Sequence, residues 1–358
     1  MALLFASRAR LRLTSVTLRT VAPRTLPAVA LVALLAGCGG DGSVGVGPGA
    51  AESHPGTSGT VATPGNAGTN VFLGASFWVE QNSNARRTAD AWRATRPADA
   101  AQLDKVAAQP QVRWFGNWNT DVARDVDAAT TTITATGALP VFVAYNIPRR
   151  DCGGMSGDNV TTVSAYRSWI AALAEGIGSR RAAVIVEPDA LAAMDCLSPA
   201  DQQTRLDLIA GAVQVLRAKG SVAVYLDAGN PGWQTAAAMA DRLRRAGIDA
   251  AQGFALNVSN FLSTPANLVY GRDISSRLGG KHFVIDTGRN GAGGTGAWCN
   301  PAGQALGERP TSATGDPLAD AYLWVKAPGE SDGACNGAAA SGEWMPEYAL
   351  GLARRAAY

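Results

Sequence analysis

Short apolar runs rich in β-branched and aromatic residues alternate with longer amphipathic stretches along most of the chain. The amphipathic stretches at residues 160–178, 201–219 and 233–246 are expected to be helices. Eight apolar runs are expected to be strands: FLGASFWV (72–79), QVRWFG (111–116), PVFVAYNI (140–147), AAVIVEP (182–188), VAVYLDAG (222–229), GFALNVSN (253–260), FVIDTG (283–288) and AYLWVKAP (321–328). This alternation predicts a parallel sheet wrapped by helices, as in an α/β barrel.

Polar side chains occupy the carboxyl ends of the last six predicted strands. They are Tyr145 and Asn146, Glu187 and Asp189, Asp227, Asn257, Asp286 and Lys326. In a β/α barrel the carboxyl ends of the strands form the rim where substrates bind and react. Strand ends are often polar simply because they are exposed, but the agreement of six strands at one rim favours a functional site.

The first 37 residues have the layout of an export signal. This segment contains five arginines, all before residue 26, and no acidic residue. The apolar run 26–36 follows the arginines. That run is much shorter than the roughly 20 residues of a membrane-spanning helix. It ends in Leu35-Ala36-Gly37-Cys38, which resembles a bacterial lipobox and implies cleavage before Cys38 and acylation of its sulfur. A soluble secreted protein is the alternative.

Residues 38–70 are expected to be a flexible tether, because they combine many glycines and prolines with almost no large apolar side chain. Residues 71–358 hold all nine tryptophans and are expected to form one catalytic domain. The protein is therefore expected at the cell envelope, at the outer membrane if the host is Gram-negative, with the lipid on Cys38 as its contact with the membrane. A monomer is expected.

Charge gives no basis for nucleic-acid binding. The whole chain has 31 basic and 29 acidic residues, and removing the five arginines of the signal leaves 26 basic residues and a net charge near −3. The sequence pI of 8.3 therefore reflects the signal rather than the domain. Basic surface is the usual footprint of a nucleic-acid partner, and this domain has no excess of it.

Four cysteines remain after Cys38, namely Cys152, Cys196, Cys299 and Cys335. An even number in an exported chain predicts two disulfides. Three pairings are possible, and we favour the sequence-local one, Cys152 with Cys196 and Cys299 with Cys335. None of the spacings is typical of a zinc site, and no metal is expected.

Histidine and nucleotide chemistry are disfavoured. Only His54 and His282 exist, and His54 lies in the tether, so neither a serine-histidine-aspartate triad nor a multi-histidine metal site is expected. His282 opens a predicted strand, where a capped or solvated ring is the simpler interpretation. GAGGTG (291–296) matches a dinucleotide fingerprint, but no helix is expected after it, so we interpret it as a glycine-rich loop and expect no cofactor.

Carboxylates and tryptophans remain as candidate chemistry. Trp78, Trp233, Trp298 and Trp344 lie in loop-like contexts and are candidates to stack on sugar rings, whereas Trp114, Trp169 and Trp324 lie in apolar runs and are expected in the core. Glycoside hydrolysis needs two carboxyl groups, one of which keeps its proton through burial or a neighbouring acid. Asp189 follows a buried strand, and Asp151 is the candidate neighbour.

Six collinear segments together resemble glycoside hydrolase family 6. They are VAYNIPRRDCG (143–153), VIVEPDAL (184–191), YLDAGNPGW (225–233), FVIDTGRNG (283–291), WCNPAGQALGERPT (298–311) and LWVKAPGESDGAC (323–335). The resemblance implies a distorted seven-stranded β/α barrel whose active-site cleft lies at the carboxyl ends of the strands. It also implies inverting hydrolysis of β-1,4-glucan and two disulfides that agree with the local pairing.

The resemblance also implies roles for individual residues. Asp189 would be the general acid, Asp151 would raise its pKa and help relay a proton, and Asp332 would be the base, with a chain of waters as the alternative. Tyr145 would favour a distorted sugar ring, and Ser156 would position water. Three tryptophans (Trp78, Trp233 and Trp298) would stack on sugars, while Asn257, Lys326 and Glu330 would bond hydroxyl groups.

Short loops around the cysteine pairs favour an open cleft and endo action on cellulose or a related β-glucan. Exo action of the cellobiohydrolase type is one alternative. Others are a hydrolase of another β-linked glycan and a surface lipoprotein that binds glucan without cutting it.

Overall fold

The computed structural model describes residues 70–157 and 161–358, so the predictions for the export signal, Cys38 and nearly all of the tether lie outside the described residues. Seven strands form one parallel sheet in sequence order. They are β1 (Arg113–Gly116), β2 (Val141–Tyr145), β3 (Ala182–Val186), β4 (Val222–Asp227), β5 (Gly253–Leu256), β6 (His282–Asp286) and β7 (Ala319–Leu323). The predicted α/β class and the expected number of seven strands are confirmed.

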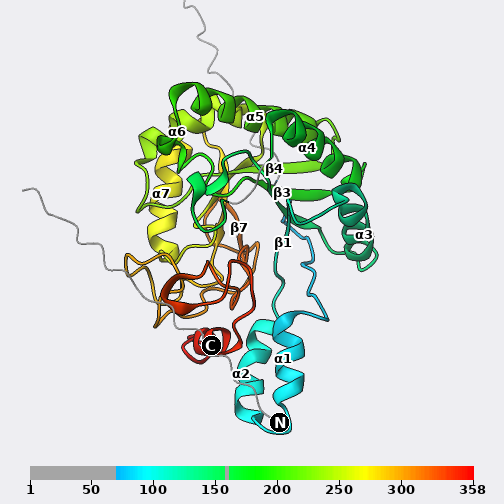
Figure 1. Ribbon diagram of the computed structural model, residues 1–358, viewed down its shortest axis with the longest axis vertical. Coiled ribbons are helices and arrows are strands. Elements are labelled where there is room, and N and C mark those ends of the chain that lie inside the picture. The colour runs from blue at the N-terminus through cyan, green and yellow to red at the C-terminus, as the bar shows by residue number, and fades with distance from the viewer. Residues whose placement is uncertain (1–69, 158–160) are drawn as a thin grey trace, which may run out of the picture. The chain divides into compact units, whose positions relative to one another are not determined.

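A helix connects each pair of successive strands up to β6. These helices are α3 (Val122–Thr134), α4 (Val163–Ile177), α5 (Pro199–Arg217), α6 (Ala236–Arg245) and α7 (Thr264–Arg277), and they follow one another along the outside of the strands (Figure 1). Residues 287–318, between β6 and β7, are all described and contain no helix. Helices α1 (Asn84–Trp92), α2 (Pro97–Ala107) and α8 (Pro346–Arg354) pack together beside the barrel. Within residues 70–157 and 161–358, no helix has both the length and the apolar character needed to cross a membrane.

From β2 to β7 almost every strand residue is buried, and successive side chains divide between two cores. On β3, Ala183 and Ile185 belong to an inner core that contains no helix side chains, whereas Val184 packs into the outer core with residues of the helices. This follows from the period of two along a strand. Phe72 lies in the inner core, with its ring 5.9 Å from that of Tyr225.

The barrel has a seam between its first and last strands. Among the described strands, β1 pairs only with β2 and β7 only with β6. The backbone N–H of Val112 donates to the carbonyl of Trp324 at 3.0 Å, and the indole N–H of Trp114 donates to the carbonyl of Val325 at 2.7 Å. Two hydrogen bonds thus replace a ladder, and the sheet is a distorted barrel rather than a closed one.

Two differences from the predicted elements concern the run 72–79 and the ends of the helices. The predicted strand 72–79 is wrong, because residues 71–74 form a turn and only Ser76 makes a single bridge, to Ala138. Gly74 adopts a left-handed backbone, with φ of 71°, which breaks the extended run. The predicted helices are present with shifted ends. Helices α4 and α6 start later than expected, directly after the side-chain caps Thr162 and Thr235, whereas α5 starts earlier, and all three end one or two residues earlier.

Candidate active site

The carboxyl ends of the strands surround two adjoining cavities. The first has a volume of about 660 Å³ and is lined by residues that include Asp151, Asp189 and Asp332. The second, of about 820 Å³, is lined by Trp78 and Glu330 among others. Both cavities are lined by Trp114, Tyr145, Ser156, Lys326 and Ser341, so they are two parts of one cleft. We refer to them as the first and second cavities.

The turn after β3 has an unusual backbone. Glu187 and Asp189 both lie in the left-handed region, with φ of 51° and 70°, on either side of Pro188. The carbonyl of Asp189 accepts a hydrogen bond from the N–H of Ala193 at 2.8 Å, and that of Glu187 accepts one from Ala190 at 3.1 Å. Residues other than glycine seldom adopt this backbone conformation, and the positions where they do so cluster at functional sites. The turn directs Asp189 into the first cavity.

Asp189 lies among other acids. Burial raises its pKa well above the usual range, and the charges of Asp227, Asp151 and Asp332 raise it further. Its backbone N–H donates to a carboxylate oxygen of Asp227 at 2.9 Å, which fixes the two loops to each other. Because ionisation at this position is costly, the side chain retains a proton at a pH where an exposed aspartate has lost it.

Asp227, the last residue of β4, is hydrogen-bonded to Asp189 directly. It is almost fully buried, and burial raises its pKa to about 7, against the N–H groups of Asp189 and Gly229, which lower it. One carboxylate oxygen accepts both of these hydrogen bonds, and the other has no partner among the described residues. The sequence pattern places Asp227 on the rim but indicates no role for it.

Asp151 and Ser156 are held together in the loop after β2. One oxygen of Asp151 accepts from both the backbone N–H and the hydroxyl of Ser156, each at 3.0 Å, and the Ser156 hydroxyl lies 3.1 Å from that of Tyr145. The disulfide Cys152–Cys196 joins this loop to the segment after Asp189. Asp151 and Asp189 are expected from the sequence to be neighbours, and the structure brings them to one cavity.

Asp332 reaches the same cavity from the loop after β7. Arg289 forms an ion pair with it, with distances of 2.8 Å and 3.0 Å to its two oxygens, and Asn300 donates a backbone N–H at 2.9 Å. The disulfide Cys299–Cys335 closes the surrounding loop. The predicted pairing of all four cysteines is confirmed. Because both oxygens of Asp332 are already bonded, its carboxylate is oriented before substrate binds.

Glu187 supports the strand that carries Tyr145. The side chain is fully buried, and its two oxygens accept from the backbone N–H groups of Asn146 and Ile147 at 3.0 Å. Burial raises its pKa to about 7, although these N–H groups lower it. The hydrogen bonds connect the end of β2 to the turn after β3 and so set the position of Tyr145 relative to Asp189.

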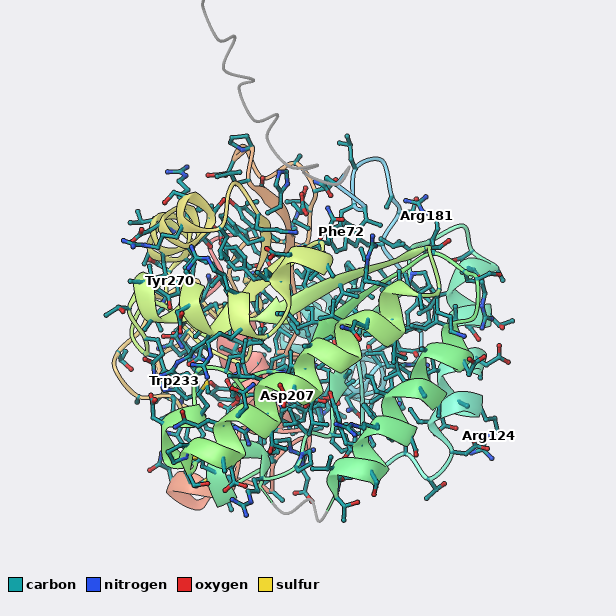
Figure 2. All side chains as sticks on the ribbon, turned by 90° about the horizontal axis from the view of Figure 1, so that it is seen from above. Phe72, Arg124, Arg181, Asp207, Trp233 and Tyr270 are labelled. Carbon is teal, nitrogen blue, oxygen red and sulfur yellow. A yellow bond between two sulfur atoms is a disulfide. The ribbon has the colours of Figure 1, made fainter. Side chains whose placement is uncertain are left out.

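Tryptophans lie along the whole cleft. Trp233 and Trp298 line the first cavity with exposed fractions of 42% and 55%, and Figure 2 shows Trp233 on the side of the molecule away from Arg124 of α3. Trp78 lines the second cavity. Trp114, which was expected in the core, packs against the inner core but is only half-buried. It also lines both cavities and packs edge-on against Tyr145, with ring centres 5.2 Å apart. Trp344 lines the second cavity, and its N–H donates to Thr88 at 3.0 Å.

Lys326 and Glu330 lie in the cleft as predicted for contacts with substrate. They approach each other to 3.6 Å, and burial lowers the pKa of Lys326 and raises that of Glu330. Asn257 does not lie in the cleft. It is fully buried with φ of 65°, and its amide donates to the carbonyl of Asp286 at 2.8 Å. It therefore braces the rim instead of facing either cavity.

Several residues of the cleft escaped sequence analysis. Asn230, Asn260 and Phe261 line the first cavity, and Trp118 lines the second. Trp118 has an asparagine on either side, the same signal that singled out the other loop tryptophans. The two asparagines of the first cavity have no such signal, since polar loop residues are common in any barrel.

A parallel β/α barrel with a cluster of acids between tryptophan platforms, at the carboxyl ends of its strands, defines a carbohydrate-cleaving hydrolase. The family model described as "Glycosyl hydrolases family 6" matches residues 72–356. The chain belongs to this family and is a glycoside hydrolase, as the resemblance implied.

Individual relatives agree with this assignment. Endoglucanase A of Cellulomonas fimi is 45% identical over 285 residues, which cover 79% of this chain and 62% of that protein. Endoglucanase 1 of Streptomyces halstedii is 41% identical over 300 residues, 80% of this chain and 91% of that protein. The structure of the endoglucanase Cel6 from Mycobacterium tuberculosis, in complex with methyl-cellobiosyl-4-deoxy-4-thio-β-D-cellobioside, is 45% identical. It has a TM-score of 0.76 and covers 80% of this chain and 98% of its own. The distorted barrel is therefore confirmed.

Proposed function

We propose that the protein hydrolyses internal β-1,4-glucosidic bonds of cellulose or a related β-glucan, with inversion at the anomeric carbon. The proposal depends on one observation above all. Asp189 faces a cleft with tryptophan platforms, and burial and neighbouring acids raise its pKa well above the usual range. A carboxyl group that keeps its proton near neutral pH can donate it to a glycosidic oxygen. The relatives named endoglucanases support the choice of substrate.

In the proposed reaction, Asp189 gives its proton to the leaving oxygen as the bond to the anomeric carbon breaks. A water molecule attacks the opposite face of the sugar and loses a proton, as inversion requires. The hydrogen-bonded pair of Asp151 and Ser156 is suited to hold or relay that water. Asp332, oriented by Arg289, is the candidate base, and transfer through water to Asp151 is the alternative. Tyr145, packed on Trp114, would press on the ring at the cleavage point.

An endo mode is supported by the exposure of the platforms in the first cavity. Trp233 and Trp298 are 42% and 55% exposed, so a chain could reach them from the side without threading. Exo action of the cellobiohydrolase type and binding without hydrolysis are the alternatives. Viscosity separates endo from exo action. Internal cuts in carboxymethylcellulose lower the viscosity early, whereas end-wise release of cellobiose leaves it high for the same amount of reducing sugar.

The experiment that tests catalysis is reducing-sugar release from carboxymethylcellulose, mixed-linkage β-glucan and xylan, for the wild type and Asp189→Ala. We expect release from both glucans by the wild type and a large loss in the variant. Binding of glucan without any release by the wild type would overturn the proposal. Proton NMR of the first product tests inversion, and an initial α-anomer is expected from a β-linked substrate.

We also propose that the protein is exported and anchored by a lipid on Cys38. The support is the sequence Leu35-Ala36-Gly37-Cys38 after a basic and then apolar segment. Dual acylation of such a cysteine suffices to hold a protein at a membrane. Fractionation of cells that express Cys38→Ala should find the protein released from membranes, and unchanged membrane association would refute lipid attachment.

A further inference from the structure

Trp118 lies just beyond β1 at the carboxyl edge of the sheet. Asn119 fixes the turn, since its side-chain oxygen accepts the N–H of Gly116 at 3.0 Å and its amide donates to Asp125 at 3.0 Å. The backbone N–H of Asn119 also donates to the carbonyl of Gly116 at 3.0 Å. This closed turn leaves the Trp118 side chain directed outward, and 53% of the residue is exposed.

One side of the Trp118 indole has a rigid support. A Cβ at Gly116 would lie 2.5 Å from two carbons of the ring and 2.8 Å from the carbonyl oxygen of Tyr145, so the missing side chain at Gly116 leaves the space that the indole occupies. The buried guanidinium of Arg150 lies 6.0 Å from the Trp118 ring and 4.3 Å from the Tyr145 ring, and it donates to the Tyr145 carbonyl at 2.8 Å. Trp118 is therefore coupled in position to the centre of the cleft.

The free part of the Trp118 ring faces a cavity suited to sugar. It lines the second cavity together with Trp78, Glu80, Asn82 and Asn117. Sugar rings offer apolar C–H faces that an indole can cover, and their hydroxyls need carboxylate and amide partners. A lone exposed tryptophan is ordinary on a protein surface. This one belongs to the cavity that is continuous with the catalytic one, and it has polar side chains around it.

We propose that Trp118 is the stacking platform of an additional glucosyl-binding subsite in the second cavity, occupied only by chains longer than those that fill the centre of the cleft. This inference rests on the proposed function. Binding energy gained at a remote unit of the substrate can be used to stabilise the transition state at the reacting bond. The subsite would therefore make hydrolysis faster for longer oligosaccharides.

The test is the dependence of kcat/KM on chain length, measured with cellotetraose and cellohexaose for the full chain, Trp118→Ala and Trp118→Tyr. We expect the wild type to prefer cellohexaose. The alanine variant should lose about tenfold on cellohexaose and less than about twofold on cellotetraose, while tyrosine restores most of the loss. Equal losses on both substrates, or no loss on either, would overturn the inference.

Two control variants separate an effect at the proposed subsite from a general effect of mutation and from the loss of another platform. Leu73→Ala removes a side chain that is 71% exposed and lines neither cavity, and it should leave both substrates unaffected. Trp298→Ala removes a platform of the first cavity and should slow both substrates. Cleavage of cellohexaose labelled with ¹⁸O at its reducing end adds a position-specific measurement, since loss of Trp118 should shift the bond that is cut, and an unchanged pattern counts against the subsite.

Failure of the proposed function looks different from failure of this subsite. In the first case the wild type cuts neither oligosaccharide, and the subsite is then tested by calorimetry of binding in Asp189→Ala and in Asp189→Ala with Trp118→Ala. Weaker binding of cellohexaose but not cellotetraose in the double variant supports the subsite, and equal binding refutes it. Equal thermal unfolding midpoints for the wild type and the Trp118 variants exclude a loss of folding as the cause.

Discussion

At the amino end of the sheet Asp320 is 1% exposed, and at the carboxyl end Asp227 is equally buried. Burial raises the pKa of both. Asp320 has a partner at each oxygen: the hydroxyl of Tyr225 at 2.7 Å and Nδ1 of His282 at 2.8 Å. Asp227 has one oxygen without a partner in the part of the chain that the structure describes, and another acid, Asp189, lies beside it.

These two carboxyl groups serve different purposes in one sheet: Asp320 stabilises the fold, whereas Asp227 contributes to the environment of the candidate acid Asp189. Hydrogen-bond donors around a buried acid offset the cost of removing it from water, so the group can be a structural anchor. Placing further acids beside it does the opposite and makes ionisation still more costly. In β/α barrels the carboxyl end is the catalytic face and the opposite end serves stability, and these two aspartates follow that division.

Asp189 offers the strongest test of the difference between the two ends of the sheet. Replacement Asp189→Asn should lower kcat on carboxymethylcellulose by roughly 10²- to 10⁴-fold, the usual contribution of a general acid. The thermal midpoint should hold or rise, because a group whose ionisation is costly is removed. A cellobioside with dinitrophenolate, whose leaving group needs no proton, is the matched substrate and should keep most of its rate. Equal losses on both substrates would contradict the acid role.

At the opposite end, Asp320→Ala should act on stability alone. The change leaves the Tyr225 hydroxyl and the His282 ring without their shared acceptor, and we expect a loss of about 2–4 kcal/mol in the free energy of unfolding. Denaturant titration measures it. For the fraction that remains folded, kcat/KM should match the wild type, so a folded variant with strongly reduced kcat/KM would show that the two ends are not independent.

The pH dependence of stability sharpens the comparison. Asp189 and Asp227 have raised pKa values in the folded state, so the folded protein binds more protons than the unfolded chain above about pH 4. The contribution of these two groups to the free energy of unfolding should therefore be complete below about pH 4 and should be lost as the pH rises from there through about 7. The thermal midpoint should drop by roughly 2–5 °C between pH 5 and pH 8.

Asp227→Asn is the matched variant for this trend, because asparagine cannot ionise and still accepts the N–H of Asp189. The decline in midpoint should become smaller in the variant. Removing the charge of Asp227 should also lower the pKa of Asp189 and move the basic limb of the kcat/KM profile to lower pH, by about one unit. A shift to higher pH would contradict the assigned direction of the coupling.

Tyr225→Phe is the mildest change. It removes one hydroxyl and leaves one oxygen of Asp320 without its donor, and it should cost about 1 kcal/mol of unfolding free energy. Chemical denaturation can resolve this, with Tyr270→Phe as the control, since the Tyr270 hydroxyl has no hydrogen-bond partner among the described residues. A larger cost for the control would argue against the importance of the Asp320 network.

Much of the fold could be predicted because most of the parallel strands are short, mainly apolar runs, and a helix follows each strand from β1 to β5. The run 72–79 has a similar composition, yet only Ser76 forms a β-bridge, and strand pairing is a tertiary property that composition does not encode. Trp114 lies in an apolar run on β1, a strand with one neighbour, so its side chain packs against the inner core and also reaches the seam and the cleft.

The site was predictable to the extent that strand order places residues on one rim. Asp189, Asp151 and Asp332 meet at one cavity for that reason, helped by the two local disulfides. Asn257 was misplaced because its left-handed backbone turns the amide toward Asp286, and a single sequence carries no sign of that turn. The roles of the individual residues stay predictions until the variants above are measured.

The seam between β1 and β7 bears on how such a protein can change its substrate range. In a continuous barrel the diameter is set by strand number and stagger, and altering it means rebuilding the ladder. Here two hydrogen bonds, from the Val112 backbone and the Trp114 indole, connect the two edge strands. The spacing of β1 and β7 can therefore change with the loss of few backbone hydrogen bonds, so a surface that handles a polymer can diversify while the other strand pairings, and the stability they provide, stay the same.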